Sequence, residues 1–281
     1  MALQPLPDID FQLAMDRVWS PNPNRVIYAK FDAESSKYLC SETRDWGTLD
    51  RDYAHLPKVH IDESAKFPNG IYLIGKLPRL IICHSVELGA NVHFSANGKG
   101  AFIGPFCQIK HDVRIATEVL LERSVKIGRS VKILGNVKID ECARIDEDSS
   151  IAGNVRIGRE AYIGTSVKIE ECVRNGSRVK IGRGSWVYPE AAIGNIVRIG
   201  KRVKIGKGSQ VRFKTRIKNN VEIGADAYIG SNVRIHENVR IQDNVWIGDG
   251  VIIGANAEIE EGAAIIDNRI IEAGTFISTS V

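Results

Sequence analysis

Aromatic residues are scarce in this chain of 281 residues, where Phe, Tyr and Trp together make up 7%. Cysteine is also rare, with five residues that show no C-x-x-C spacing. The cysteines therefore exclude a disulfide framework and a zinc knuckle. No apolar run reaches about 20 residues, the length that crosses a membrane. The start, MALQPLPDIDFQLAMDRVW, lacks the basic opening of a secretory signal. We expect a cytoplasmic protein.

Charge is unevenly distributed along the chain. Residues 100–219 carry 24 Lys and Arg against 12 Asp and Glu, whereas residues 220–281 carry 3 against 10. The basic middle and the acidic end predict more about binding partners than the formal net charge of +4 does.

A repeat with a period of six accounts for most of the sequence. From Ile103 to Ile277, 30 positions follow one another in steps of six, and 26 of them are Ile. A second apolar or small residue lies two positions before each except at Arg269, so the unit is V-x-I-G-x-x. V-x-I predicts a short strand with two side chains facing inward and one outward. The other three residues predict a corner, where Asn, Asp and Gly tolerate a positive φ.

The repeat extends upstream to about residue 59, with two insertions of three residues. One insertion follows Leu73, and the other lies around Asn97, Gly98 and Lys99. This adds six units, for a total of 36.

The V-x-I-G-x-x unit resembles the hexapeptide repeat of the left-handed parallel β-helix, the fold of trimeric acyltransferases typified by the lipid A acyltransferases and of γ-class carbonic anhydrases. The resemblance covers about residues 59–281. It implies an all-β, left-handed parallel β-helix with 18 residues per coil, and hence about 12 coils here. It also implies a homotrimer.

Residues 1–58 do not repeat and predict a small α+β cap domain before the β-helix of residues 59–281. Residues 10–19 predict a short amphipathic helix that the PNPN sequence at 21–24 ends. RVIYAKF and KYLC predict two strands joined by a turn at DAESS. The alternative to a capping role is substrate recognition.

One side of the predicted prism is strongly basic. Residues 18 apart stack on one side, and this side carries Lys126, Arg144, Lys180, Arg198, Arg216 and Arg234. Like charges on adjacent strands repel. The row is either a solvated face that keeps the sheet soluble or a track for a polyanion, such as an acidic polysaccharide, nucleic acid or an anionic membrane.

The last third of the β-helix has an unusually apolar exterior, which is typical of an interface. We expect oligomer contacts, including pairing of two molecules end to end through the C-terminal coil, at Tyr228, Trp246, Ile252, Ile270 and Phe276.

The resemblance implies a histidine as general base, a role that suits imidazole. His93 matches best, because it occupies an outward position just before the second insertion. Arg114 one coil on, and Lys99 in the insertion, would bind the phosphates of an acyl-CoA co-substrate; no permanently bound cofactor is expected. The γ-carbonic anhydrase alternative needs three histidines around zinc, and no close pair of histidines on adjacent units supports it, so no metal site is predicted.

Two functions therefore remain open. One is a hexapeptide-type acyltransferase that moves an acyl group from CoA or a carrier protein to a sugar or amine. The other is a non-catalytic rod that acts as an oligomeric scaffold or binds a polyanion. The longest insertions are only three residues, which favours the rod, and the family resemblance favours the enzyme.

Overall fold

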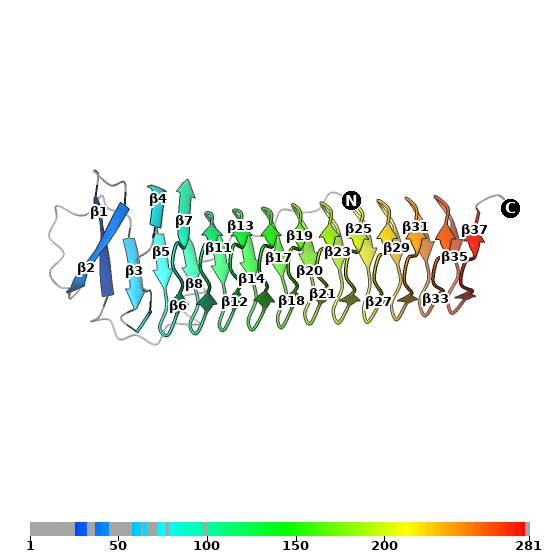
Figure 1. Cartoon of the computed structure of the whole chain (residues 1–281), viewed down its shortest axis with the longest axis horizontal. Helices are drawn as coiled ribbons and strands as arrows, with labels where there is room; N and C mark the ends of the chain where they lie inside the picture. Colours follow the sequence, from blue (N-terminus) through cyan, green and yellow to red (C-terminus); the bar gives the residue numbers. More distant parts are fainter. Residues whose placement is uncertain are drawn as a thin grey trace. The chain divides into compact units, whose positions relative to one another are not determined.

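The computed structural model describes residues 26–32, 37–44, 58–62, 64–66, 72–76, 79–97 and 100–278. Within these ranges every regular element is a strand (Figure 1). The helix predicted at residues 10–19 lies outside them. The chain divides into two compact units, Leu6–Cys142 and Ala143–Val281, the second together with Met1–Pro5. The boundary predicted after residue 58 stays a prediction.

The N-terminal unit is a parallel β-solenoid with three faces, numbered in chain order. Its first face contains β3 (Lys58–Asp62), β5 (Arg79–Ile82), β8 (Ala101–Ile103), β11 (Val119–Leu121) and β14 (Val137–Ile139). Its second face contains β6 (Glu87–Leu88), β9 (Gln108–Ile109) and β12 (Lys126–Ile127). Its third face contains β4 (Tyr72–Lys76), β7 (His93–Asn97), β10 (Arg114–Ile115) and β13 (Lys132–Ile133).

The C-terminal unit also has three faces, and each of its strands has two residues. The first contains β17 (Arg156–Ile157), β20 (Arg174–Asn175), β23 (Ala192–Ile193), β26 (Gln210–Val211), β29 (Tyr228–Ile229), β32 (Trp246–Ile247) and β35 (Ala264–Ile265). The second contains β15 (Arg144–Ile145), β18 (Tyr162–Ile163), β21 (Lys180–Ile181), β24 (Arg198–Ile199), β27 (Arg216–Ile217), β30 (Arg234–Ile235), β33 (Ile252–Ile253) and β36 (Ile270–Ile271). The third contains β16 (Ser150–Ile151), β19 (Lys168–Ile169), β22 (Trp186–Val187), β25 (Lys204–Ile205), β28 (Glu222–Ile223), β31 (Arg240–Ile241), β34 (Glu258–Ile259) and β37 (Phe276–Ile277).

Together the two units have about 11 turns of about 18 residues, close to the 12 coils predicted. The difference arises in the first turn. There the described residues of the second face form no strand, and an isolated bridge joins Lys66 to Glu87 of β6. The predicted parallel β-solenoid is confirmed.

A hairpin precedes the solenoid, as predicted. β1 (Val26–Asp32) pairs antiparallel with β2 (Lys37–Arg44), and the register shifts between Ile27 and Tyr28. β1 also pairs antiparallel with β3 through Val26 and Ile27. The hairpin therefore covers the edge of the first face that β3 would otherwise leave open.

The core consists of the two inward positions of each repeat. In the repeat that contains β24, for example, Val197 is fully buried and Ile199 is nearly so, while Arg198 between them is exposed. Each coil hydrogen-bonds to the next through backbone groups, for example from Arg198 N to Thr215 O at 3.0 Å. The narrow core takes aliphatic side chains, which explains the low aromatic content.

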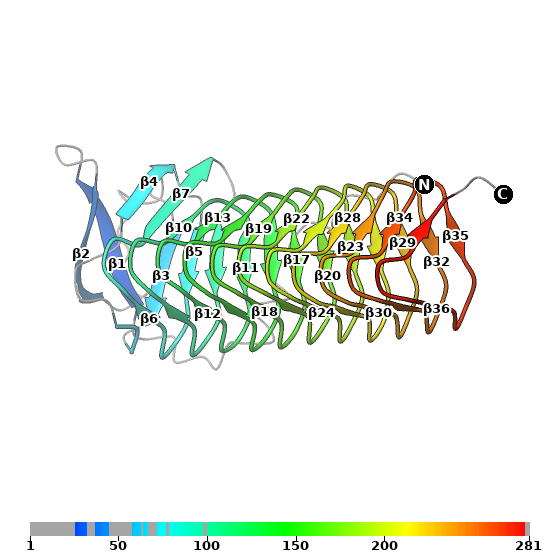
Figure 2. The ribbon, with the colours of Figure 1, turned by 45° about the vertical axis from the view of Figure 1, so that its right-hand side comes forward.

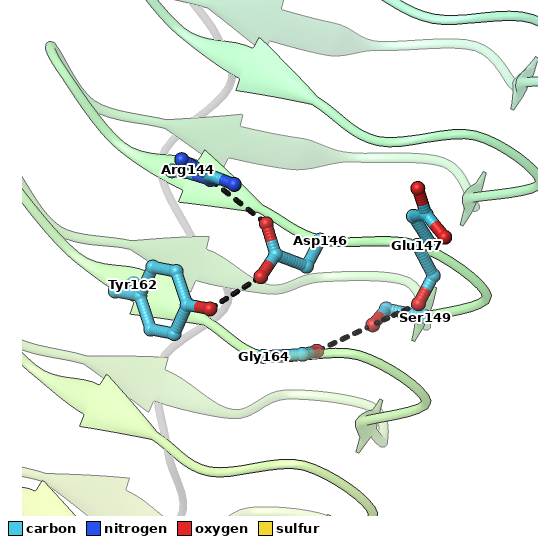
Figure 3. A network of polar contacts seen from close by, with 6 residues as sticks. All are labelled: Arg144, Asp146, Glu147, Ser149, Tyr162 and Gly164. Carbon is cyan, nitrogen blue, oxygen red and sulfur yellow. Dashed lines mark hydrogen bonds and ion pairs between the residues drawn. The ribbon is translucent and has the colours of Figure 1, made fainter.

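Four buried inward positions carry a hydroxyl, and each of these hydroxyls has a partner in the next coil. Ser149 Oγ donates to Gly164 O at 2.8 Å (Figure 3). It also accepts from Val167 N at 3.2 Å. Ser185, Ser209 and Thr215 donate in the same way to the carbonyl 15 residues on. These hydroxyls thereby avoid the cost of an unpaired buried polar group.

The corners adopt the left-handed conformation that the repeat predicts. From Phe106 to Gly274, every sixth residue has a positive φ, in most cases between 52° and 63° for the residues other than glycine. Most are Asn, Asp, Ser or Gly, but Ile196 has a φ of 62°. The position in the repeat, and not the residue type, therefore sets the backbone conformation at these corners.

Asn175 interrupts the column of isoleucines and is 3% exposed. It lies between Ile157 and Ile193 in register, and neither its Oδ1 nor its Nδ2 has a hydrogen-bond partner among the described residues. The core therefore contains one polar side chain whose desolvation is not compensated.

We expect Asn175→Val to raise the free energy of unfolding by about 1–3 kcal/mol, because it removes two unpaired buried polar atoms. Urea unfolding followed by circular dichroism measures the change. Asn195→Val is the matched control, because Asn195 Oδ1 accepts a hydrogen bond from Ser177 N at 2.8 Å and its loss destabilises. A less stable Asn175→Val protein would contradict the expectation.

Candidate functional site

A polar cluster lies where two successive corners of the N-terminal unit lead into the third face. The corner before β7 ends at Asn91, and the corner before β10 contains His111 and Asp112. Asn91 and Asp112 both have a positive φ, and Asp112 N donates to Ala90 O at 2.9 Å. The two corners therefore stack one on the other.

Close packing of these corners requires a glycine. A Cβ on Gly89 would lie 2.5 Å from the backbone N of His111, well inside contact distance. Because Gly89 has no Cβ, its corner can pack closely against the backbone at His111. This close approach sets the spacing between the two corners.

Asp112 is the centre of the cluster. Its Oδ2 lies 2.7 Å from His111 Nδ1, and its Oδ1 accepts a hydrogen bond from Asn91 Nδ2 at 2.9 Å. These hydrogen bonds hold the pKa of the Asp112 carboxyl below its usual value, and the one to His111 has the largest effect. The nearby charges of His111 and His93 lower this pKa further. The carboxylate is therefore ionised and in position to orient the imidazole.

The side of the His111 ring that faces away from Asp112 is accessible to a ligand. Its side chain is 50% exposed, and its Nδ1 faces Asp112. Nε2 is the ring nitrogen left to exchange a proton with a ligand. An imidazole held by a carboxylate in this way is the arrangement of a general base.

His93, the base predicted from the sequence, belongs to the same cluster. It is the first residue of β7, its side chain is half-buried, and it pairs in register with Arg114 as predicted. Arg114 in turn pairs with Lys132, and both side chains are exposed. Neither has an ion-pair partner among the residues that the structure describes, so one free cation lies next to His93 in register and a second lies on the strand after it. Lys99 lies outside the described residues, and its predicted role stays a prediction.

The two predicted insertions form one feature. β4 and β7 have five residues each and pair in parallel from Tyr72 and His93 to Lys76 and Asn97 (Figure 2). The later strands of this face have two residues. The added residues therefore extend the third face as a two-stranded flange that begins at His93.

The other described histidines of the repeat have structural contacts. The ring of His84 packs edge-on against Phe106, with centroids 4.9 Å apart. His236 Nδ1 lies 3.9 Å from Glu237 Oε2. Among the described residues, no three His, Cys, Asp or Glu side chains come together to hold a metal ion.

The predicted basic row lies mainly on the second face of the C-terminal unit. Arg144 at its start is already paired: its Nε lies 2.8 Å from Asp146 Oδ1, and Tyr162 OH bonds the other oxygen (Figure 3). The hydrogen bond to Asp146 raises the pKa of both Arg144 and Tyr162. The four cations that follow are described below. Lys126 lies in the N-terminal unit, in register with Gln108.

The predicted interface residues are spread over all three faces of the C-terminal unit. Tyr228 and Trp246 stack on the first face, with centroids 5.9 Å apart. Ile252 and Ile270 lie on the second face, and Phe276 lies on the third. Trp246, Ile270 and Phe276 are exposed, as is Ile266 at the corner between the first and second faces. The structure thus confirms an apolar exterior here but does not gather it on one face, and an oligomer interface stays a prediction.

The link between His111 and Asp112 was not identified from the sequence. The signal was present: the insertion around residue 98 changes the stacking interval from 18 to 21 residues, which places Asn91 beside Asp112. The side-chain contact itself depends on rotamers that the sequence does not give.

Comparison with known families supports the repeat. The model described as bacterial transferase hexapeptide (six repeats) matches residues 214–249 and 226–261. The model described as hexapeptide repeat of succinyl-transferase matches residues 244–279. The fold and the repeat define the chain as a hexapeptide-repeat β-solenoid. More particularly, residues 214–279 are similar to the repeats that these two family models describe.

Several solved structures are similar at low identity. LpxA from Acinetobacter baumannii is 16% identical over 61% of this chain and 64% of its own, with a TM-score of 0.37. UDP-N-acetylglucosamine O-acyltransferase from Moraxella catarrhalis is 20% identical over 61% of this chain and 67% of its own, with a TM-score of 0.26. The chain thus spans less than two thirds of the Acinetobacter protein. The comparison with curated proteins finds no match. No described helix is long and apolar enough to cross a membrane.

Proposed function

We propose that the protein is a hexapeptide-type acyltransferase whose general base is His111, oriented by Asp112. The observation that carries the proposal is the contact of 2.7 Å between His111 Nδ1 and a carboxylate that Asn91 also holds. His111 is preferred to His93 because its oriented, half-exposed ring leaves Nε2 for a substrate proton.

The chemistry requires one proton transfer in each direction. Nε2 of His111 accepts the proton of an acceptor hydroxyl or amine as the acceptor O or N bonds to the thioester carbonyl carbon. The C–S bond then breaks, and the thiolate of the donor leaves and takes the proton from the imidazolium. His93 lies close enough to interact with the Asp112 charge and would contact the acceptor or the thioester.

Arg114 and Lys132 would bind the donor. An acyl-CoA carries phosphates. The free guanidinium of Arg114 and the free ammonium of Lys132, on adjacent strands, suit such an anion. The flange formed by β4 and β7 would supply one wall of the site. The acceptor would be a sugar or an amine, and the active form a homotrimer, as the family resemblance implies.

Acyl-CoA binding tests this function directly. We expect acetyl-CoA to bind the full chain by calorimetry, and Arg114→Gln together with Lys132→Gln to weaken binding about 100-fold or more, since two charged hydrogen bonds of about 1.5–3 kcal/mol each are lost. Lys204→Gln with Lys168→Gln is the matched control, because it removes two cations from the third face of the C-terminal unit. The absence of binding at millimolar acetyl-CoA, or equal loss in the control, would refute the proposal and favour the non-catalytic alternative.

A further inference from the structure

Four exposed cations stack in register on the second face of the C-terminal unit. They are Lys180, Arg198, Arg216 and Arg234, on the adjacent strands β21, β24, β27 and β30. None has an ion-pair or hydrogen-bond partner for its side chain among the described residues. Like charges on adjacent strands destabilise a sheet, so this row lowers the stability of the unit.

The third face of the same unit shows that the fold does not require such a row. There Lys204 Nζ lies 2.9 Å from Glu222 Oε1, and Arg240 lies 3.8 Å from both Glu222 and Glu258. The hydrogen bond to Glu222 raises the pKa of Lys204. Cations alternate with acids on the third face, whereas cations stack on one another on the second face. This difference indicates that the anionic partner of the basic row lies outside the chain.

The basic area is broader than one row. The corners on both sides of these strands add exposed cations that also lack ion-pair partners in the described part of the chain: Arg178, Arg183, Lys201, Arg202, Arg212, Lys214 and Lys218. We call these residues and the four of the row the basic face. Glu237, at the corner after β30, is the single acid in the corners that border this face, and it lies next to His236.

The residues of the basic face favour a partner with a flat anionic surface over a nucleic acid. After Tyr162 the row has no aromatic side chain on which a nucleic-acid base could stack. The one exposed aromatic residue of the area, Phe213, is at a corner, 41% exposed, and Lys214 Nζ lies 4.9 Å from its ring centroid. A planar array of cations with an apolar ring at its edge is complementary to a membrane surface with anionic headgroups.

We propose that the basic face binds the surface of an anionic lipid bilayer. Headgroup phosphates and carboxylates contact the row and both flanking corners, and Phe213 inserts at the level of the headgroups. Because every contact except that of Phe213 is an exposed charge, binding weakens steeply as salt shortens the Debye length. The proposal is independent of the acyltransferase proposal, whose residues lie in the N-terminal unit.

Co-sedimentation of the full chain with vesicles tests the proposal. We expect binding to vesicles of 30% phosphatidylserine in phosphatidylcholine, little binding to phosphatidylcholine alone, and loss of binding at 0.5 M NaCl. Arg198→Gln with Arg216→Gln should weaken binding about 20- to 30-fold, at about one kcal/mol per cation near the surface. Phe213→Ser should weaken it further.

The matched control removes two cations from the paired face. Lys204→Gln with Arg240→Gln has the same net charge as the double variant of the basic face and should bind almost as well as the unmodified chain. Equal loss in the two double variants would show that net charge alone acts and would overturn the proposal. So would tight binding to heparin or duplex DNA without binding to vesicles, which would assign the basic face to a linear polyanion. Circular dichroism of each variant verifies that it is folded.

Discussion

His111→Gln should lower kcat for acyl transfer by about 10²–10⁴-fold, the usual contribution of a positioned general base. Glutamine keeps much of the size and polarity of the side chain but cannot accept and return the proton. KM for the acyl-CoA donor should change little, because in the proposed site Arg114 and Lys132, and not His111, bind the donor. Steady-state kinetics with the acceptor identified for the unmodified protein measures both constants.

Asp112→Asn separates orientation of the imidazole from proton transfer. The amide removes the negative charge that holds His111 Nδ1 at 2.7 Å. Its shape is similar to that of the carboxylate, so Asn91 keeps a hydrogen-bond partner at position 112. We expect a loss in kcat as well, smaller than or equal to that of His111→Gln, because the imidazole itself remains. The two losses should not add in the double variant, since both act through one group.

Variants of the same cluster distinguish the two candidate bases. Lys110→Gln, at the exposed position beside His111, should leave kcat unchanged. If His93→Gln abolishes activity while His111→Gln retains it, His93 is the base, as the sequence predicted, and the assignment of His111 is wrong.

Gly206→Ala should lower the free energy of unfolding by about 3 kcal/mol, at the upper end of the cost of overpacking. Gly206 is buried, and a Cβ there would lie 2.0 Å from Gly224 O and 2.2 Å from Gly224 C, both backbone atoms of the next coil. The clash can be relieved only by separating two coils. That movement would strain the hydrogen bond of 2.8 Å from Gly206 N to Ile223 O.

The loss should be concentrated in the neighbouring coils, because each repeat contacts only those next to it. Urea unfolding gives the total loss, and hydrogen exchange of the amides of β25 and β28 shows where it occurs. Lys218→Ala is the matched control: it occupies the same position in its repeat, is exposed, and should change stability by no more than about 0.5 kcal/mol. A loss of that small size for Gly206→Ala would show that the coils can separate without cost.

The sequence alone determined which side chains form the core, and together with the family resemblance it predicted the solenoid and its three faces. An unbroken period of six fixes which side chains face inward, as at Val197 and Ile199, because alternation along a strand leaves only the residue between them outside. With three repeats per coil, as the resemblance implies, and no insertion, the residue 18 positions on stacks beside it, as Arg216 does beside Arg198. The left-handed corners follow from the same period, even where the residue is Ile196.

Only the tertiary structure decided which outward charges are neutralised. Arg144 and Arg198 occupy equivalent positions in the repeat, but Arg144 is bound to Asp146, which follows Ile145 at the corner, whereas Gly200 follows Ile199. The chemistry of the cluster was also decided there: the insertion around residue 98 places Asn91 next to Asp112, but only the rotamer of His111 turns its ring toward the carboxylate. A repeat dictates backbone positions, whereas contacts between long or polar side chains depend on torsions that periodicity leaves free.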